Sequence, residues 1–302
     1  MSNTFKNRVF GCAIIKSINS NYNADFSHQP RTLPNGVVYA TDKALKWSVR
    51  NYWKNVLNEK VFYVKTLTEE MSPRTLDETY EHYFGEEKDK SKIRVNVLRN
   101  LLSCLDVKLF GGTYAGKTNI SIHGTCQITH GVNRFNENVI YSEQIMSPFR
   151  NPGEKNTTST MTTLGNQSKL QEGHYVHHFS VNPQNIAQDV ARVEAEGLTE
   201  DDIAKLKEGL RSGVTYYDSS AKAGTENELL LWVQLQPAAK IVLPSFVELI
   251  TINEEKQIDL EKVKNLLAKP HIQSAIEKVE LYYNQDITKV INAPEGAEVQ
   301  EL

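Results

Sequence analysis

The sequence has few of the features that define several common protein classes. Among its 302 residues there are only three cysteines, Cys12, Cys104 and Cys126, widely spaced and in apolar surroundings. Three isolated cysteines argue against a disulfide framework or a zinc site and predict buried thiols. No apolar run approaches the roughly 20 residues of a membrane span, and the N-terminus lacks the charged-then-apolar pattern of a signal peptide. We therefore expect a cytoplasmic protein that contacts no membrane.

Net charge is also low, at −3, but its distribution is uneven. Residues 1–60 carry +6, residues 61–184 are neutral and residues 185–302 carry −9. Such asymmetry is typical of a protein that binds a polyanion at one end, and it also fits head-to-tail self-association. The length allows one large domain or two small ones.

The clearest functional signal is a two-faced helix with Thr41 as its N-cap and Asp42 in its first turn. At about 100° per residue, one stripe is apolar, with Leu45, Val49, Tyr52 and Val56, and the opposite stripe is basic, with Lys43, Lys46, Arg50 and Lys54. Four bases on one stripe with no acid to offset them predict an anionic partner. The alternative is an ordinary surface helix whose lysine stems cover apolar neighbours.

A polar loop precedes this helix. It offers side chains of the kind that hold phosphate and sugar groups: Asn21, Asn23, Ser27, His28, Gln29 and Arg31. Together, the loop and the helix predict a nucleic-acid contact.

Hydrophobic periodicity predicts the remaining elements. Strands are expected at Arg8–Ile18, Asp106–Phe110, Ile120–Thr129, Asn138–Met146, His174–Val181, Glu228–Gln236, Phe246–Ile252 and Val279–Tyr283. Further helices are expected at Lys92–Leu105, Thr199–Gly213 and Asp259–Ala268. Ser147–Gly173 has the composition of a long functional or mobile loop, and the acidic tail from Asn292 that of a frayed end. Irregular alternation of these elements favours an α+β fold with an RRM-like or ferredoxin-like antiparallel sheet.

One motif suggests a different function. The segment Gly111–Thr118, GGTYAGKT, matches the phosphate-binding loop of P-loop nucleotide hydrolases. That chemistry requires a helix to begin at Lys117, so that its amides face the phosphates. The residues that follow alternate as in a strand, which favours a glycine loop between two strands and leaves the hydrolase as a rival interpretation.

Histidines and acids provide weaker signals. His174, His177 and His178 suggest metal ligands, but on a strand His177 and His178 point to opposite faces, which favours polar contacts to RNA or a neighbour, or plain surface. Asp25 and Asp106 are isolated acids that could serve metal-assisted cleavage of RNA, yet neither has a partner carboxylate nearby in the sequence. A metal-dependent ribonuclease is therefore the second rival.

The predicted long loop joins apolar wedges to a cation. Met146 and Phe149 beside Arg150 are the combination that single-strand binders use to unstack and hold bases. The alternative is that Phe149 only anchors the loop to the body of the protein.

Several segments, taken in order, resemble a known family. They are NADFSHQPRTLPNGVVYATDKALKWSVRNYW, DVKLFGGTYAG, MSPFRNPGEKN and EGHYVHHFSVNP. In combination they resemble the backbone subunit of Cascade, the type I CRISPR surveillance complex, most closely its type I-B branch. The resemblance covers roughly residues 8–185.

This resemblance implies one RRM-like palm domain over residues 1–302, with a finger-like insertion at 59–91 and a thumb-like one at 136–173. It implies a non-enzymatic protein without a cofactor, whose partners are guide RNA, copies of itself in a filament, other Cascade subunits and, through the guide, target DNA. By position, Lys43, Lys46 and Arg50 would hold guide phosphates, assisted by Asn21, Asn23 and Arg31. The glycine loop of Gly111, Gly112 and Tyr114 would lie near the RNA, and Met146 and Phe149 would be the candidate wedges.

Overall fold

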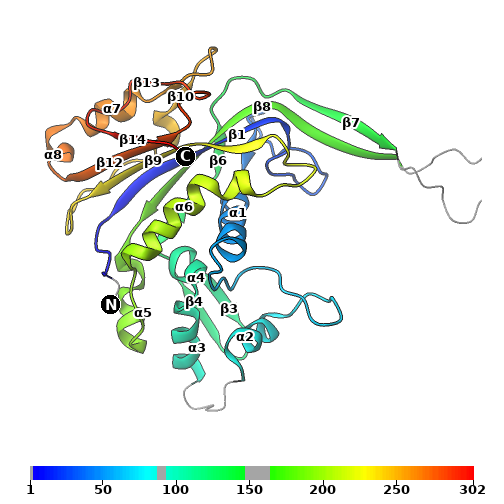
Figure 1. Cartoon of the computed structure of the whole chain (residues 1–302), viewed down its shortest axis with the longest axis vertical. Helices are drawn as coiled ribbons and strands as arrows, with labels where there is room; N and C mark the ends of the chain where they lie inside the picture. The colour runs from blue at the N-terminus through cyan, green and yellow to red at the C-terminus, as the bar shows by residue number, and fades with distance from the viewer. Residues whose placement is uncertain (1–2, 87–92, 147–163) are drawn as a thin grey trace, which may run out of the picture.

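The computed structural model describes residues 3–86, 93–146 and 164–302. These residues form a large, mostly antiparallel sheet in the strand order β14-β12-β9-β1-β8-β6-β2, with β5 and β7 also paired to β8 (Figure 1). Its strands are β1 (Val9–Ser20), β2 (Tyr39–Ala40), β5 (Cys126–Ile128), β6 (Gly131–Asn133), β7 (Ile140–Met146), β8 (Leu164–Val181), β9 (Thr225–Leu235), β12 (Ile276–Tyr283) and β14 (Glu298–Gln300). The predicted antiparallel sheet is thus confirmed.

Strand β1 lies at the centre of the sheet because its sequence is apolar on both faces. It pairs antiparallel with β8 on one side and β9 on the other. Ala13 and Ile15 face one layer of the protein, and Cys12 and Ile14 face the other. At Gly11 a Cβ atom would lie 2.3 Å from the carbonyl oxygen of Leu231, so only glycine allows the strands to pack here.

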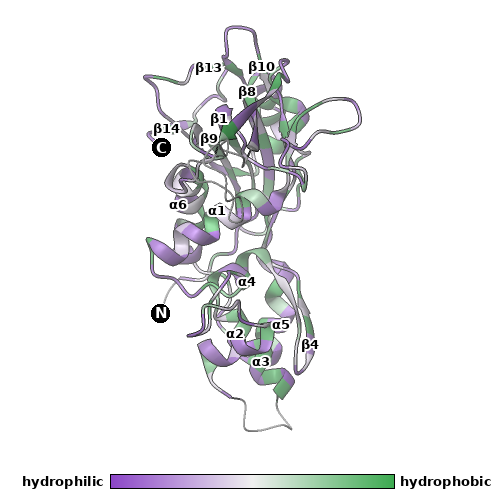
Figure 2. Cartoon of the chain, turned by 90° about the vertical axis from the view of Figure 1, so that its right-hand side faces the viewer, coloured by the Kyte–Doolittle hydropathy of each residue, from purple (hydrophilic) through white to green (hydrophobic). Residues whose placement is uncertain are grey.

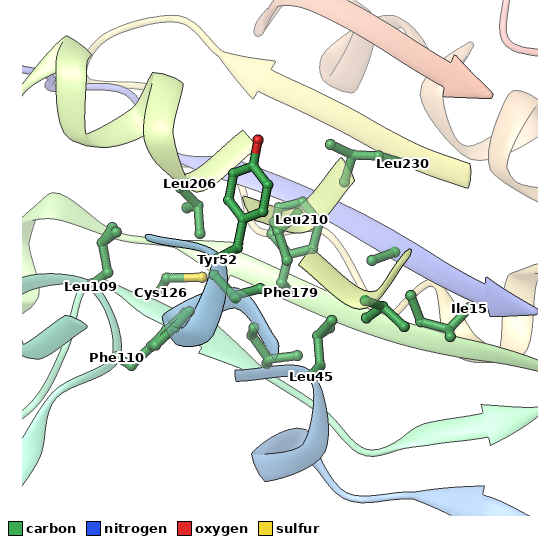
Figure 3. Close-up of a cluster of buried hydrophobic side chains, with 14 of the residues drawn as sticks. Ile15, Leu45, Tyr52, Leu109, Phe110, Cys126, Phe179, Leu206, Leu210 and Leu230 are labelled. Atoms are coloured by element: carbon green, nitrogen blue, oxygen red, sulfur yellow. The ribbon is translucent and has the colours of Figure 1, made fainter. Parts of the chain in front are cut away.

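Two helices, α1 (Asp42–Asn55) and α6 (Glu200–Tyr216), cover one face of the sheet. Leu45 from α1 and Leu206 and Leu210 from α6 meet Ile15 and Phe179 of the sheet in a shared core (Figure 3). The predicted start of α6 is confirmed, since Thr199 and its N3 acid form a reciprocal capping box.

The opposite face is covered by the C-terminal layer. Its elements are η2 (Val247–Leu249), β10 (Thr251–Ile252), β11 (Ile258–Asp259), α7 (Glu261–Leu267), α8 (Pro270–Gln273) and β13 (Val290–Ile291). The predicted strand Phe246–Ile252 is wrong over most of its length, because a 3₁₀ turn precedes a two-residue strand. The tail does not fray, since β14 pairs with β12.

A separate lobe lies beyond α1 (Figure 2). It contains α2 (Leu76–Phe84), α3 (Ile93–Leu102), α4 (Leu105–Phe110), β3 (Gly112–Ala115) and β4 (Asn119–Ile122), and it receives η1 (Pro183–Ile186) and α5 (Ala187–Val193) from later in the chain. We call it the finger lobe. The predicted finger, 59–91, covers only part of it, and the predicted strand Asp106–Phe110 is wrong because this segment is the helix α4.

The hairpin of β7 and β8 projects from the sheet as a long arm (Figure 1). The two strands stay paired from Ile140 opposite Leu170 to Met146 opposite Leu164. The predicted loop Ser147–Gly173 is therefore wrong over residues 164–173, which are strand. Residues 147–163 lie outside the described residues.

The cysteines and the apolar segments can now be placed in the fold. All three cysteines are buried and free of disulfides, as predicted. Within the described ranges, no helix is both long and apolar enough to cross a membrane.

Candidate nucleic-acid interface

The polar loop of residues 21–38 is anchored between helix α1 and the base of the arm. Asn23 Oδ1 accepts hydrogen bonds from the backbone N–H and the hydroxyl of Thr41, at 2.9 and 3.0 Å. The buried Asn21 donates to the carbonyl of Ser168 in β8, at 3.2 Å. Both asparagines, predicted to contact RNA, thus use their side-chain amides inside the protein. They position the loop on the arm and beside the start of α1.

The loop itself presents one aromatic side chain and one unsatisfied cation. The Asp25 carboxylate accepts from the backbone N–H groups of Ser27 and Gln29, at 2.8 and 2.9 Å. This turn holds the ring of Phe26 in solvent, with 99% of its surface exposed. Arg31 is half-buried, and its Nε finds no hydrogen-bond partner within the described residues. Arg31 is therefore the loop residue best suited to hold an incoming anion.

The basic stripe of α1 is less free than its sequence predicts. Lys46 Nζ lies 3.1 Å from Asp42 Oδ2, one helical turn away, and this cation holds the pKa of Asp42 below its usual range against the opposing effect of burial. Arg50 Nε donates to Asp106 Oδ2 at 3.0 Å. The prediction that no acid offsets the stripe is thus wrong for both Lys46 and Arg50.

Arg50 and Asp106 form a buried connection between α1 and the finger lobe. Asp106 is fully buried and also accepts from the backbone N–H groups of Phe62 and Tyr63, at 2.8 and 2.9 Å. The Arg50 guanidinium lies over the ring of Phe110 as well, 5.2 Å from its centroid. Both carboxylate oxygens of Asp106 are therefore engaged in holding α1 against the finger lobe.

Lys43 makes only a loose ion pair on α1, with 3.9 Å between its ammonium and Asp42 Oδ1, and it has an aromatic neighbour. Its side chain is 84% exposed, and Trp47, one turn further along, is 39% exposed. The Trp47 ring packs edge-on against Tyr217, with 4.2 Å between the ring centroids. Residues four apart on a helix share a face, so a cation and a π surface lie side by side.

A second cation completes this surface. The Lys222 ammonium lies 5.8 Å from the Tyr217 ring and 5.1 Å from the Tyr22 ring, and it donates to the Tyr22 carbonyl at 2.7 Å. Burial lowers the pKa of Lys222 to about 8. No carboxylate of the described residues forms an ion pair with it. A desolvated ammonium without an anion is costly, and a phosphate would supply the missing charge.

We call Lys43, Trp47, Tyr217 and Lys222 the basic-aromatic patch. Sequence reasoning identified Lys43 and missed the other three. The spacing of Trp47 from Lys43 was an available signal, whereas Tyr217 and Lys222 meet α1 only through the tertiary fold.

The glycine loop lies within the finger lobe. Gly111 has φ +70°, and a Cβ there would lie 2.3 Å from the carbonyl oxygen of Ile122, while at Gly112 it would collide with the ring of Tyr63. Tyr114 is buried and its hydroxyl donates to Asp77. These three residues, predicted to lie near RNA, use their special geometry for internal packing.

The P-loop lookalike is a hairpin turn. β3 pairs antiparallel with β4 across it, so a strand and not a helix follows Lys117. The Lys117 N–H donates to the carboxylate of Asp77 at 3.0 Å, and its ammonium pairs with Glu81. Carboxylates already pair with the groups that would cradle a phosphate, so this segment lacks the geometry of a phosphate-binding P-loop, and the prediction of a glycine loop between two strands is confirmed.

One predicted wedge, Met146, lies at the outer part of the described arm. Met146 ends β7 with 63% of its surface exposed. Phe149 and Arg150 lie outside the described residues. The exposed thioether at the end of a projecting hairpin agrees with the geometry that a base wedge requires.

The three histidines are buried in β8, which contradicts the expectation of RNA contacts or plain surface. His174 Nδ1 lies 2.6 Å from Glu228 Oε2, His177 lies on the helix side against Tyr22, and His178 Nδ1 accepts from the Phe246 N–H on the other side. The predicted opposite orientation of His177 and His178 is thus confirmed. Within the described chain, no group of three or more histidines, cysteines and acids is placed to hold a metal ion.

Comparison with known proteins agrees with this geometry. Residues 7–269 match the family described as CRISPR-associated protein Cas7, so the chain belongs to that family. A search of curated proteins finds no match.

Solved structures provide the same fold. A chain from a structure described as "CRISPR RNA-guided surveillance complex, pre-nicking" aligns with a TM-score of 0.60 and 14% identity, covering 98% of this chain and 96% of that one. A chain described as "CRISPR RNA-guided surveillance complex" aligns with a TM-score of 0.52 and 12% identity, covering 95% of each chain. Identities this low establish a shared fold.

Proposed function

We propose that this protein is a guide-RNA-binding backbone subunit of a type I CRISPR surveillance complex, of the I-B kind. Copies of it assemble along the guide, join other Cascade subunits and present the guide for pairing with target DNA. The observation that carries the proposal is the half-buried ammonium of Lys222, which has no carboxylate partner among the described residues and lies over Tyr217, the ring that packs against the exposed Trp47, on a chain of the Cas7 family.

The sheet topology supports an RRM-like palm. Four antiparallel strands lie in the order β9-β1-β8-β6, and the helices α1 and α6 pack on one face. Along the chain these elements follow as strand, helix, two strands, helix and strand, which is the order of the split βαβ pattern. The finger lobe and the β7–β8 arm are then the insertions between its elements.

The basic-aromatic patch suits a single strand of any sequence. Every base has a π face that can stack on an aromatic ring, and phosphates are the same at every position. A guide changes its sequence from one target to the next, so a backbone subunit must bind it without reading bases. Trp47 and Tyr217 would stack bases, Lys43 and Lys222 would hold phosphates, and Met146 on the arm would displace a base.

We propose a non-catalytic role, supported by the state of the two candidate acids. The Asp106 carboxylate is buried under three hydrogen bonds, and Asp25 Oδ1 is engaged by two backbone amides. Neither is arranged as a free metal ligand for phosphodiester cleavage.

The test uses a short single-stranded RNA that accommodates one copy of the protein. Trp47→Ala removes a stacking surface of about 1–3 kcal/mol per base, so affinity should fall to a similar extent for every sequence. Lys43→Ala should lower the slope of log affinity against log salt by about 0.7, the value of one single-strand phosphate contact.

Lys262→Ala, at an exposed position of α7 on the other side of the sheet, is the matched control and should change neither quantity. A loss confined to particular sequences, or a salt slope unchanged in Lys43→Ala, would contradict the proposed surface.

A further inference from the structure

An apolar groove of about 550 Å³ lies beside the N-terminal segment of the chain. Its inner surface includes the buried side chains of Phe5, Ile186 and Leu198, and its other lining residues include Lys6 and Arg8. No carboxylate from the described residues lines it. Lys6 is exposed, and Arg8 Nε is buried without a hydrogen-bond partner in the described part of the chain. We call this feature the N-terminal groove; it would accept apolar side chains flanked by acids.

The loop between α1 and α2 has the complementary chemistry. We call residues 65–74 the finger loop. Leu67 and Met71 are 41% and 78% exposed, and between them lie Glu69 and Glu70, both exposed and without an ion pair among the described residues. A backbone hydrogen bond of 3.0 Å from the Met71 N–H to the Thr68 carbonyl closes the tip. Met71 has φ +61°, an uncommon conformation for a residue with a side chain. The tip is therefore preorganised, with two apolar side chains and two acids presented to solvent.

The groove and the loop lie on opposite sides of the molecule. In Figure 1 the N-terminus and α5 are at the left, whereas the loop between α1 and α2 projects to the right, on the same side as the β7–β8 arm. Two different surfaces facing opposite ways define a heterologous contact, which produces an open filament when the rotation between copies does not close a ring.

We propose that the finger loop of one copy docks in the N-terminal groove of the next, which rests on the filament assembly proposed above. Met71 and Leu67 enter the apolar groove, and Glu69 and Glu70 pair with the partner's basic side chains at its edge. The occupant is a second copy of this chain, because both surfaces belong to the same molecule, complement each other in charge and face opposite ways.

A crosslinking experiment tests this contact in the RNA-bound protein. The variant Met71→Cys/Ala187→Cys places thiols on the loop and on an exposed wall of the groove, and the three native cysteines are buried. A short bis-maleimide should convert RNA-assembled protein into a ladder of covalent multimers on a denaturing gel. The matched control is Met71→Cys/Val242→Cys, with the second thiol exposed but outside the groove. Equal crosslinking in both variants, or in neither, would overturn the proposal.

Charge exchange provides an independent test. Glu69→Lys/Glu70→Lys places like charges against the groove, and Lys6→Glu/Arg8→Glu does the same from the other side. Each double variant should weaken association of adjacent copies by at least about tenfold, and the quadruple variant should recover most of the loss. The proposed pairing of the finger loop with the N-terminal groove would be refuted if either double variant assembled as wild type does. It would also be refuted if the quadruple variant unfolded at the temperature of wild type but did not recover assembly.

The short RNA that accommodates one copy separates this inference from the function on which it rests. All charge-exchange variants should bind it as wild type does, because neither surface belongs to the basic-aromatic patch. If wild type does not bind it, the proposed function fails. If wild type binds RNA and assembles, but neither crosslinking nor charge exchange behaves as described, only the docking proposal fails.

Discussion

The buried pair of Arg50 and Asp106 gives the strongest prediction about stability. Asp106→Ala removes an acceptor from Arg50 and from the N–H groups of Phe62 and Tyr63. Breaking one partner of a buried ion pair costs about 3–5 kcal/mol, and each stranded buried donor adds about 1–3 kcal/mol. Because these contributions are not additive, we expect Asp106→Ala to lower the free energy of unfolding by at least about 4 kcal/mol. This is a large share of the roughly 5–15 kcal/mol that stabilises a typical domain.

Arg50→Met is the complementary change. It keeps an apolar stem against Phe110 and leaves Asp106 with two amide donors, so we expect a smaller loss of about 3 kcal/mol. Lys117→Met is the control, since it breaks only the exposed pair with Glu81 and should leave the free energy of unfolding close to that of wild type. Urea unfolding followed by circular dichroism measures all three free energies of unfolding.

The same variants distinguish structural from RNA-binding roles of Arg50. If the role of Arg50 is structural, the folded Arg50→Met variant should keep the wild-type slope of log RNA affinity against log salt. If Arg50 contacts a phosphate, this slope should fall by about 0.7. The structural role of the Arg50–Asp106 pair would be refuted if Asp106→Ala lost less than about 1 kcal/mol of unfolding free energy. It would also be refuted if Arg50→Met lowered the salt slope of RNA binding.

Two further predictions concern acid sensitivity and backbone geometry. Burial lowers the pKa of His177 to about 4, whereas the unfolded chain takes up this proton near pH 6.5. His177 should therefore lower the free energy of unfolding by about 2–3 kcal/mol between pH 6.5 and 4, and His178, whose pKa burial also lowers to about 4, adds to this fall. Urea midpoints across this range measure the effect, and a His177→Gln variant with the pH profile of wild type would contradict it. Gly111→Ala should lower the free energy of unfolding by at least about 2 kcal/mol more than Gly36→Ala does. Both positions have positive φ, but only Gly111 lacks space for a Cβ atom. Equal losses in urea unfolding would show that the close backbone approach at Gly111 has no effect on stability.

Much of the sheet and both palm helices could be predicted because their signals are local. β1 is apolar from Val9 to Ile15, α1 and α6 keep one buried stripe over several turns, and α6 begins with a capping box. α4 was misread because six residues are too few to distinguish helical from strand periodicity. The first half of β8 was misread as loop because an arm that projects from the sheet does not require alternating apolar residues.

The candidate site was only partly predictable. Lys43 as an exposed base follows from the helix pattern, but Asp106 lies 56 residues from Arg50, and no sequence window shows that it neutralises that base. Lys222 reaches the patch from the loop after α6, so its desolvation appears only in the fold. Long-range pairing decides which cations of a basic stripe remain available to a ligand.

The most direct test of the central claim is the mass of the purified protein on a single-stranded RNA long enough for several copies. Our account predicts particles whose masses rise in steps of one protein chain, with the number of copies set by RNA length and independent of its sequence. A protein that stays monomeric and free of RNA at every RNA length would contradict it.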